Sequence, residues 1–463
     1  MEQILQEMKY MRRDMTSSEY ILDTSKEYSI YTCHKRGIPR VTDGLKNGQR
    51  QALWLIRNKT EKIKVIALAG AMIESELYLH GDKSAADSIS KLAAPFCNNV
   101  PYLVGKGNFG TRVSPVGGIG APRYVSVKKG QAVERLIYPD LDIVPLMDNH
   151  DGSTKEPETF LPIIPTVLLN GVAGIAVGWS TDILPHKLED LIKATKAALE
   201  GKKVPKLIPS YDYFDITVKK VPGVENSWEF TGKVEIISTS VARVTELPPD
   251  LTLENFRAQL AQMEDNGAIM DYTDKSTKAI NIEIKFRRGS LKDMSPEQLI
   301  DTLKLKSRKK ERIVVIDWDG QAIRTYDNPE QVVVDFVAWR FTKYIERYEK
   351  LRDVTNSEIK FWKGVQMCYL DDLPDRLTKM ANKAEMDKEI QDITKSVKLS
   401  DAQIDRISNF ASYRWTKDGY KQCVEKIHEL EQQYKEYIRL LKNPDDIKDI
   451  FIEEIDALKK VKF

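Results

Sequence analysis

The spacing of apolar and polar residues divides the chain into three regions. Up to about residue 150, helical patterns at 48–58 and 84–96 alternate with glycine-rich loops, which predicts a compact α/β region. From about 151 to 330, short β-rich runs separated by turn clusters predict an α+β domain with antiparallel strand pairing. The change of pattern places a domain boundary near 150 to 170. The clearest β-rich runs are 214–218, 228–238 and 280–286.

After about residue 330 the pattern becomes helical. Apolar residues recur at spacings of three and four, first from Phe341 to Leu351 and again from Ile427 to Leu441. Two such runs flanking a small insert, 373–420, predict an antiparallel coiled coil with a knob at its tip. An ordinary amphipathic helical bundle explains the same periodicity equally well.

Composition and charge narrow the class of protein. With 463 residues the chain is too long for one ordinary core, which favours two to four domains. Its 41% hydrophobic and 30% charged residues are typical of a globular protein. The 71 Lys+Arg and 69 Asp+Glu leave a net charge of only +2, but nine basic residues lie between Lys35 and Lys64, against Asp43 and Glu61. This asymmetry predicts a basic face near the N-terminus.

The chain carries no signal for secretion or membrane insertion. Met1–Thr16 lacks the apolar core of a signal peptide, and no run of about 18 apolar residues occurs. The four cysteines are far apart and form no CxxC pair, which fits a reducing interior. We therefore expect a cytoplasmic protein. Residues 1–20 fit an arm that exchanges onto a partner, and they fit a frayed terminus equally well.

Two short motifs have competing interpretations. Gly105–Gly110 reads GxGxxG, but two prolines and three further glycines follow within 111–122, so the helix that a dinucleotide-binding loop requires is not expected. A glycine loop that approaches another phosphate stays open. Asp317 and Asp319 follow an apolar strand and could hold Mg²⁺, but a hairpin turn through Asp319-Gly320 explains them without chemistry.

Arg123-Tyr124 follows the glycine loop and is a candidate pair for attack on a phosphodiester. A phenol of pKa about 10 is a poor nucleophile at neutral pH. It needs a neighbouring cation or a metal to favour the phenolate and to stabilise the charge that grows in the transition state. Because Arg-Tyr dipeptides are common, spacing alone is also compatible with a structural tyrosine. The five histidines are scattered and indicate neither a catalytic triad nor a zinc site.

Four separated motifs give these residues a context. They are the runs 36–50 (RGIPRVTDGLKNGQR), 78–87 (YLHGDKSAAD), 105–112 (GKGNFGTR) with 122–124 (PRY), and 169–179 (LNGVAGIAVGW). Their order and spacing resemble the breakage-reunion region of type IIA DNA topoisomerases. The resemblance covers nearly the whole chain from about residue 20 onward. The forms of the motifs are similar to the branch that contains the eukaryotic enzymes and the medium subunits of T-even-like bacteriophages.

The resemblance implies roles for eleven residues. Tyr124 would be the nucleophile with Arg123 beside it, and Ile175 would be a wedge that intercalates between base pairs and bends the duplex. DNA would be bound by basic and polar residues of the first three motifs: Arg36, Lys46, Gln49, Arg50, His80, Lys83, Ser84 and Arg112.

The same resemblance implies an α+β multidomain fold. A winged-helix (CAP-like) DNA-binding domain would span 21–155, and an α/β tower domain would span 156–332. A long antiparallel coiled coil would be formed by 333–370 and 421–463. It would carry a small helical C-gate domain at 371–420.

The implied reaction is that of the DNA-cleaving and religating subunit of an ATP-dependent topoisomerase. Tyr124 would form a transient 5′-phosphotyrosyl link to each strand, so that a second duplex can pass, giving relaxation or decatenation. The chain lacks the family's ATPase domain and its acidic metal-binding domain. Mg²⁺ and ATP are therefore expected to be bound mainly by a large partner subunit, with no metal site in this chain. Two copies of each subunit, associating through the C-gate, would act on double-stranded DNA, in the host cytoplasm if the chain is phage-encoded.

Three positions depart from the family pattern and bear on drug sensitivity and sequence preference. Asn47 stands where many members have a proline, Leu79 where many have a second histidine, and Lys83 where bacterial relatives have a small polar residue. Two functions of other classes also stay open. One is a catalytically silent architectural protein that bends DNA with the same basic face, and the other is a nuclease that uses Asp317 and Asp319.

Overall fold

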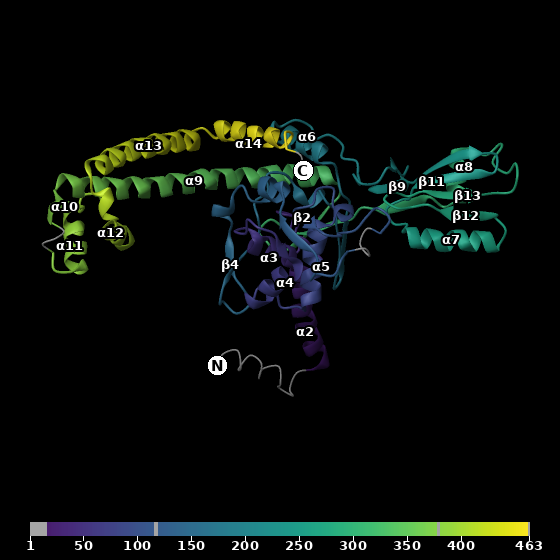
Figure 1. Cartoon of the computed structure of the whole chain (residues 1–463), viewed down its shortest axis with the longest axis horizontal. Coiled ribbons are helices and arrows are strands. Elements are labelled where there is room, and N and C mark those ends of the chain that lie inside the picture. Colours follow the sequence, from purple (N-terminus) through teal and green to yellow (C-terminus); the bar gives the residue numbers. More distant parts are fainter. Residues whose placement is uncertain (1–15, 115–118, 377–379, 462–463) are drawn as a thin grey trace. The chain divides into compact units, whose positions relative to one another are not determined.

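The computed structural model describes residues 16–114, 119–376 and 380–461. Contacts divide the chain into two compact units, whose elements are labelled in Figure 1. Unit 1 extends to Arg340 and resumes at Glu454, and unit 2 is Phe341–Glu453. The predicted N-terminal arm lies mostly outside the described residues, which include only its last five positions, 16–20.

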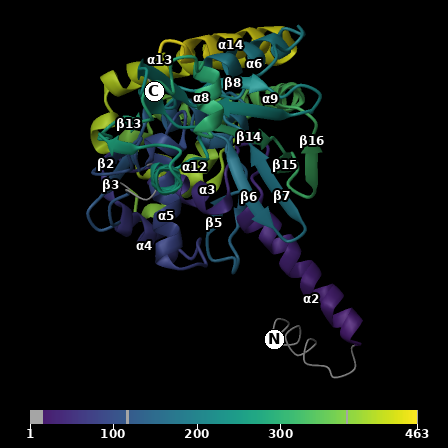
Figure 2. The same cartoon turned by 90° about the vertical axis from the view of Figure 1, so that its right-hand side faces the viewer.

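The first described element of unit 1 is a helix that leaves apolar side chains in solvent. Helix α2 (Ser17–Thr32) starts with a capping box, in which Thr16 and Glu19 satisfy each other's backbone N–H groups. Its residues Tyr20, Ile21 and Leu22 are exposed. The helix continues into a π-helical turn, Cys33–Gly37, and Figure 2 shows α2 projecting from the rest of unit 1.

Three helices and a three-stranded antiparallel sheet follow. The helices are α3 (Asn47–Ile56), α4 (Val65–Glu74) and α5 (Asp82–Ala93), and they contact one another. The sheet has the order β1 (Ile63–Lys64), β3 (Ser126–Lys129), β2 (Leu103–Lys106). Its inner side chains, such as Val127 and Leu103, are buried. Helices predicted at 48–58 and 84–96 are confirmed as α3 and α5, with ends that differ by a few residues.

Two β-hairpins pack near the π-helical turn. Hairpin β6 (Val172–Ala176)–β7 (Trp179–Ile183) contacts that turn, and β7 contacts hairpin β15 (Ile313–Ile316)–β16 (Ile323–Tyr326). Asp317 and Asp319 lie in the β15–β16 turn, where the Asp319 N–H donates to Asp317 Oδ1 at 3.1 Å. No group of three or more His, Cys, Asp or Glu in the described residues could hold a metal ion. The hairpin turn is confirmed.

The β-rich region, residues 217–310, contains two antiparallel sheets, as the alternating runs predict. One has the order β14 (Lys306–Lys310), β9 (Ser227–Thr231), β8 (Thr217–Lys220). The other has the order β10 (Lys233–Ser238), β11 (Val241–Glu246), β13 (Ile282–Lys285), β12 (Asp271–Asp274). Helices α7 (Leu253–Asp265) and α8 (Pro296–Thr302) bury leucines in the core of this four-stranded sheet. Alternate strand residues such as Ala242 and Val244 form the sheet's share of that core.

Further short elements lie in the described part of unit 1. They are β4 (Leu146–Asp148), β5 (Lys155–Pro157), α6 (Leu188–Leu199), and the helical turns Pro95–Cys97, Val133–Ile137, Leu141–Ile143 and Thr166–Leu168.

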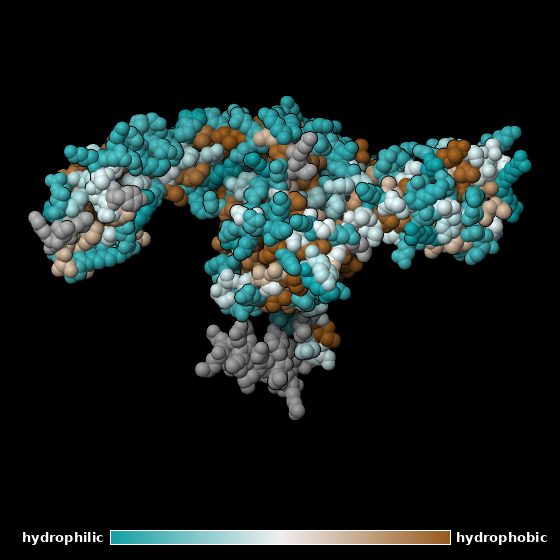
Figure 3. Space-filling model, viewed as in Figure 1, coloured by the Kyte–Doolittle hydropathy of each residue, from teal (hydrophilic) through white to brown (hydrophobic). Residues whose placement is uncertain are grey.

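Unit 2 is helical and contains the antiparallel pairing that the sequence predicts. The part of helix α9 (Pro329–Leu370) in this unit pairs with α13 (Lys417–Lys442) and the start of α14 (Pro444–Leu458). Tyr348 lies near Tyr437, and further along α9 the Trp362 carbonyl accepts from Cys423 near the beginning of α13, so the helices run in opposite directions. The outward surface of α13 is largely hydrophilic in Figure 3.

Small helices pack at the far end of this pair. They are α10 (Leu373–Arg376), α11 (Lys383–Ile393) and α12 (Asp401–Ser408), followed by the turn Ser412–Arg414. Their core joins Phe361 and Val365 of α9 with Ile390 and Ile404. None of the helices in the described parts of the chain combines the length and apolar character needed to span a membrane.

A buried ion pair connects the start of α3 to the segment that follows β5. The Asp43 carboxylate accepts from Arg50 Nε at 2.7 Å and Nη2 at 2.9 Å, and it also accepts from the Phe160 N–H at 3.0 Å. Arg50 is only 3% exposed. The expectation that Arg50 contacts DNA is therefore corrected, because its guanidinium is turned inward and is already engaged by Asp43 and by the Leu45 carbonyl.

Replacing Asp43 by alanine would leave the Arg50 charge buried without its partner. We expect this variant to lose about 3–5 kcal/mol of unfolding free energy, measured by urea denaturation. As a control, Glu229→Ala removes the partner of the largely exposed Arg308 and should cost about 1 kcal/mol or less. Equal losses in the two variants would contradict the structural role of the Asp43–Arg50 pair.

Candidate nucleic-acid interface

Tyr124 projects into solvent from a tight turn. Its side chain is 74% exposed, and its backbone N–H donates to the Ala121 carbonyl at 2.9 Å. The Arg123 guanidinium carbon lies 4.9 Å from the centroid of the Tyr124 ring, within the range of a cation–π contact. An exposed phenol beside a cation is accessible to a large polyanionic substrate. The burial expected of a structural core tyrosine is absent.

The residues around the turn fix its position. The Val65 N–H donates to the Val125 carbonyl at 3.1 Å, and the Ile66 N–H donates to the Pro122 carbonyl at 3.2 Å. The first turn of α4 therefore binds both ends of the turn. Val125 is buried, and β3 begins immediately after it. Tyr124 is thus an exposed side chain on a well-anchored backbone.

The glycine loop supports this turn from behind. Gly107 has φ +114°, and a Cβ there would lie 2.9 Å from Val125 Cγ1, so only glycine fits this packing. The Gly120 N–H donates to the Asn108 carbonyl at 2.8 Å, which closes the loop. No helix starts in the described residues directly after the loop, so the dinucleotide interpretation is excluded there. The glycines serve close packing against the residue next to Tyr124.

A groove of about 610 Å³ lies between the π-helical turn, α3, α5 and β6, and we call it the basic groove. No Asp or Glu belongs to its described lining. Lys83 is exposed on the first turn of α5, next to Ser84, but is not part of the lining. Five of the predicted DNA-binding residues line the groove, namely Arg36, Lys46, Gln49, His80 and Ser84, together with Lys35 and Lys91.

Hydrogen bonds orient the side chains of the basic groove. Lys46 Nζ donates to the Ala173 carbonyl at 2.8 Å, and burial together with Lys91 lowers the pKa of Lys46. The Arg36 guanidinium lies 2.7 Å from His80 Nδ1. Burial and the Arg36 charge lower the pKa of His80, so this imidazole is neutral at pH 7 and can serve as a hydrogen-bonding group. Tyr78 Oη bonds Ser84 Oγ at 2.8 Å.

Ile175 is 87% exposed near the tip of the β6–β7 hairpin. The hairpin approaches the π-helical turn so closely that a Cβ on Gly174 would collide with the Gly37 carbonyl oxygen. Val177 and Trp179 beside Ile175 are also exposed, which makes the tip apolar. Burial in the core, the ordinary role of an isoleucine, does not apply here. The structure instead presents an apolar tip on the hairpin that lines the basic groove.

Arg112 was expected to bind DNA, and the structure corrects this expectation. Its side chain is 8% exposed, and its Nε donates to Glu246 Oε1 at 2.8 Å. Its Nη2 donates to the same carboxylate and to the Leu247 carbonyl. A guanidinium that is buried in this way is not available to a phosphate.

The comparisons with known proteins identify the family. Residues 36–456 match the model of DNA gyrase/topoisomerase IV, in its A-type subunit. The chain belongs to this family. The DNA topoisomerase medium subunit of Enterobacteria phage T4 is 32% identical over 364 residues, which are 76% of this chain and 79% of that protein. The resemblance that the sequence motifs indicate is confirmed.

Eukaryotic type II topoisomerases are similar over a comparable share of the chain. DNA topoisomerase 2 of Arabidopsis thaliana is 31% identical over 75% of this chain and 24% of that protein. Human DNA topoisomerase 2-alpha is 29% identical over 74% of this chain and 23% of that protein. The chain therefore spans about a quarter of the length of these two relatives.

One solved topoisomerase structure has the same overall fold as the present chain. The DNA-binding, cleavage and re-ligation domain of Plasmodium falciparum topoisomerase II superposes with a TM-score of 0.82, at 22% identity. The match covers 97% of this chain and 65% of that chain. The mixed α/β fold is therefore shared over nearly the whole of the present chain.

The sequence analysis counted Lys62 and Lys64 in a basic stretch but missed that they meet Lys106 and Lys128 at the sheet next to Tyr124. We call these four lysines the lysine face. Lys64 and Lys106 both pair with Ser126, one from each neighbouring strand, and Lys128 lies two residues further along β3. All four lysines are exposed, and none forms an ion pair with any residue that the structure describes. The proximity of Lys62 lowers the pKa of Lys106. Each of the three strands contributes one of these lysines and Lys62 directly precedes β1, so the lysines form a face only when the strands pair.

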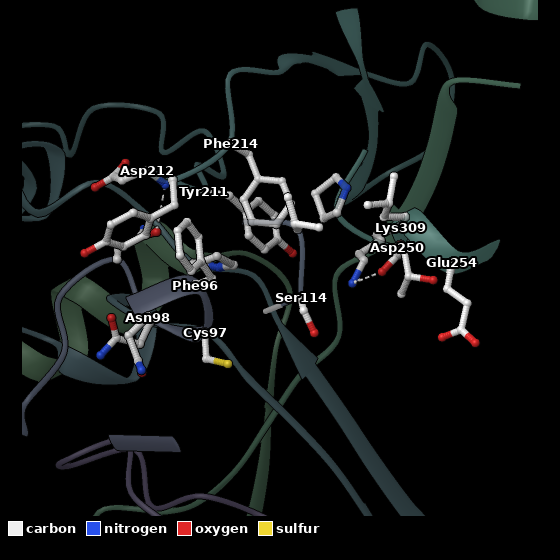
Figure 4. Close-up of a pocket in the computed structure, with 18 of the residues that line it drawn as sticks. Phe96, Cys97, Asn98, Ser114, Tyr211, Asp212, Phe214, Asp250, Glu254 and Lys309 are labelled. Carbon is white, nitrogen blue, oxygen red and sulfur yellow. Dashed lines mark hydrogen bonds and ion pairs between the residues drawn. The ribbon is translucent and has the colours of Figure 1, made fainter. Parts of the chain in front are cut away.

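A second cavity of unit 1 lies at a different place and is shown in Figure 4. It has a volume of about 670 Å³ and is lined by aromatic side chains, including Phe96, Tyr211 and Phe214. An ion pair of 2.8 Å joins Lys309 and Asp250 at its edge. None of the predicted site residues lines this cavity.

Proposed function

We propose that this chain is the DNA-cleaving and religating subunit of an ATP-dependent type IIA topoisomerase, with Tyr124 as the nucleophile. The observation that carries the proposal is the solvent-exposed Tyr124 ring, stacked near Arg123 on an anchored turn in a member of this family. The residue that the motif assigns to chemistry is thus accessible to a duplex. The backbone beneath it is held by α4 and by the glycine loop.

The proposed reaction is a transesterification. The Tyr124 phenol loses its proton, and Oη attacks the scissile phosphorus. The new Oη–P bond replaces the P–O3′ bond, and the 3′ oxygen leaves and takes up a proton. The 5′ end stays joined to the tyrosine, so the reverse attack by the 3′-hydroxyl restores the strand without an external energy source. Arg123 holds the phosphate and offsets the charge of the transition state.

Among the described residues, no group of three or more His, Cys, Asp or Glu could hold a metal ion. We therefore derive no step of this chain through a metal. In the proposed enzyme, Mg²⁺ and ATP are bound mainly by a larger partner subunit. The name of the phage T4 relative, a medium subunit, supports the existence of such a partner. This division makes the isolated chain a DNA-binding protein that cleaves poorly.

The DNA follows two positively charged surfaces in this proposal. One is the basic groove, where Arg36, Lys46 and the neutral His80 contact the backbone near the cleaved bond. The other is the lysine face, which continues the sheet directly beyond Tyr124. Its lysines are spread over roughly 10 Å across three strands, which is about one Debye length at 0.1 M salt, so their charges reinforce one another.

Ile175 is the proposed wedge between base pairs. Unstacking one base step costs a few kcal/mol, which is offset when the bent duplex contacts more protein surface. The 87% exposure of this isoleucine and its place on the hairpin that lines the basic groove support the role.

The domains of the proposed enzyme follow the predicted divisions. A winged-helix domain (21–155) includes the three-helix and three-stranded part of unit 1, and a tower domain (156–332) includes the β-rich region. The antiparallel pairing of α9 with α13, and the helices α10 to α12, support a coiled coil that ends in a C-gate. Two copies of this chain associate there, and a transported duplex leaves through this gate during relaxation or decatenation.

Tyr124→Phe is expected to abolish covalent attachment, because the phenylalanine ring offers no oxygen to phosphorus. The measurement uses the chain reconstituted with its partner subunit, Mg²⁺ and end-labelled duplex, trapped with detergent. Protein-linked 5′ ends should form with the wild type and be absent with the variant. The partly exposed Tyr213 provides the control, because Tyr213→Phe should leave attachment unchanged. Attachment by Tyr124→Phe would refute the assignment, and DNA bending without any attachment by the wild type would favour the architectural protein.

Removing the lysine face should weaken DNA binding in a salt-dependent manner. For the triple variant Lys62→Gln, Lys106→Gln and Lys128→Gln, we expect the slope of log affinity against log salt to fall by about 0.9 for each phosphate that the variant no longer neutralises. Fluorescence anisotropy with a duplex measures the slope. The matched control changes the exposed Lys203, Lys278 and Lys292 to glutamine and should keep the wild-type slope. Identical slopes for the two triple variants would remove the lysine face from the DNA path.

A further inference from the structure

Arg112 joins the glycine loop to the β-rich region through a buried ion pair. Besides its bonds to Glu246, its guanidinium carbon lies 4.2 Å from the centroid of the Phe214 ring. Phe214 in turn lines the cavity in Figure 4, on the opposite side from Ser114. The next residue, Val113, packs against the core of the four-stranded sheet. This end of the glycine loop is therefore embedded in the β-rich region.

Glu246, the partner of Arg112, is held from several directions. Its Oε1 accepts from Arg112 and from the Leu247 N–H at 2.9 Å, and its Oε2 accepts from the Asp215 N–H at 3.0 Å. The residue ends β11 and is 6% exposed. A buried carboxylate with this many donors has one defined position, so the guanidinium that binds it has one as well.

The other end of the loop is fixed to the Tyr124 turn. Asn108 accepts the Gly120 N–H, and Phe109 forms a bridge with Ile119. Gly107 packs on Val125, the residue after Tyr124. From Asn108 to Arg112 the chain advances four residues, which span at most about 14 Å when fully extended. The β-rich region and the Tyr124 turn are thus connected by a short link with both ends anchored.

We propose that Arg112 is a positioning residue whose ion pair with Glu246 sets the placement of the Tyr124 turn relative to the β-rich region. The inference rests on the proposed function of Tyr124. In it, Arg112 touches neither DNA nor the reacting phosphate. It acts through the glycine loop, so DNA binding is independent of Arg112 while attack by Tyr124 depends on it. Loss of the ion pair lets the loop shift, and misplacing a reacting group by about 1 Å can slow a reaction about 100-fold.

The chemistry of the pair selects the variants. Arg112→Lys keeps the charge but loses the fork of Nε and Nη2 donors, and Arg112→Gln loses the charge as well. Glu246→Gln keeps the shape of the side chain and removes the negative charge at the end of the link that lies in the β-rich region. Glu246 is distant in sequence from every motif that contacts DNA, so an effect of this variant on cleavage reports the coupling itself. The double variant completes a cycle that measures whether the two residues act as one unit.

The experiment compares covalent attachment and DNA affinity in the complex with the partner subunit. With saturating duplex and Mg²⁺, Arg112→Gln and Glu246→Gln should each slow attachment about 100-fold, and the double variant should be no slower than either. Arg112→Lys should be intermediate. The dissociation constant for DNA and its salt slope should stay within about twofold of wild type in all of them. The control variants Arg308→Gln and Glu229→Gln break an ion pair in the same β-rich region whose arginine is largely exposed, and they should attach at the wild-type rate.

Other outcomes would overturn the inference. A lower salt slope in Arg112→Gln, without an effect of Glu246→Gln, would make Arg112 a DNA-binding residue. Wild-type attachment rates in both variants would show that the pair does not position the turn. Parallel losses of DNA affinity and attachment, with a lowered melting temperature, would show only a role in folding. Failure of the wild type itself to become attached would instead refute the proposed function, so the two claims are tested separately.

Discussion

One buried carboxylate, that of Asp43, sets the geometry on which the basic groove depends. It binds Arg50 of α3 and the backbone at Phe160, and the Asp43 carbonyl accepts from Thr166 Oγ1. A charge taken out of water is tolerated only when its partners are well placed, so these bonds leave α3 a single position. Lys46 and Gln49, at the start of that helix, are thereby presented to the groove. The buried Asp43–Arg50 ion pair thus fixes the helix that presents basic and polar side chains to the basic groove.

Some of the charged side chains are buried in ion pairs, whereas others are exposed to solvent. Arg50 and Arg112 are paired with buried carboxylates, whereas the four lysines of the lysine face have no acidic partner among the described residues. Tyr124 and Ile175 are exposed although an aromatic ring and an isoleucine are usually buried. Exposed aromatic and apolar side chains can contact stacked bases, and cations without acidic partners can contact a negatively charged backbone. Together they suit an anionic ligand with stacked bases.

The periodicity of the sequence was sufficient to predict helices and strands. It was not sufficient to predict which residues pair with the charged side chains. The helices at α3 and α5, the antiparallel strands and the Asp317–Gly320 turn follow from local patterns and are confirmed. The roles of Arg50 and Arg112 could not be predicted in the same way. A motif shows that a cation is present, but it does not show in which direction the side chain points. The partner of Arg112, Glu246, is 134 residues away. The lysine face likewise joins strands some sixty residues apart, so only tertiary structure reveals it.

The most direct test of the account is to locate the bond between protein and DNA. The covalent complex formed by the chain, its partner subunit, Mg²⁺ and duplex can be trapped, digested with nuclease and trypsin, and sequenced by mass spectrometry. The account predicts that the nucleotide remnant is carried by the peptide that follows Arg123 and ends at Lys128, on the oxygen of Tyr124. A remnant on any other residue, or none in a reaction that breaks DNA, would contradict the central claim.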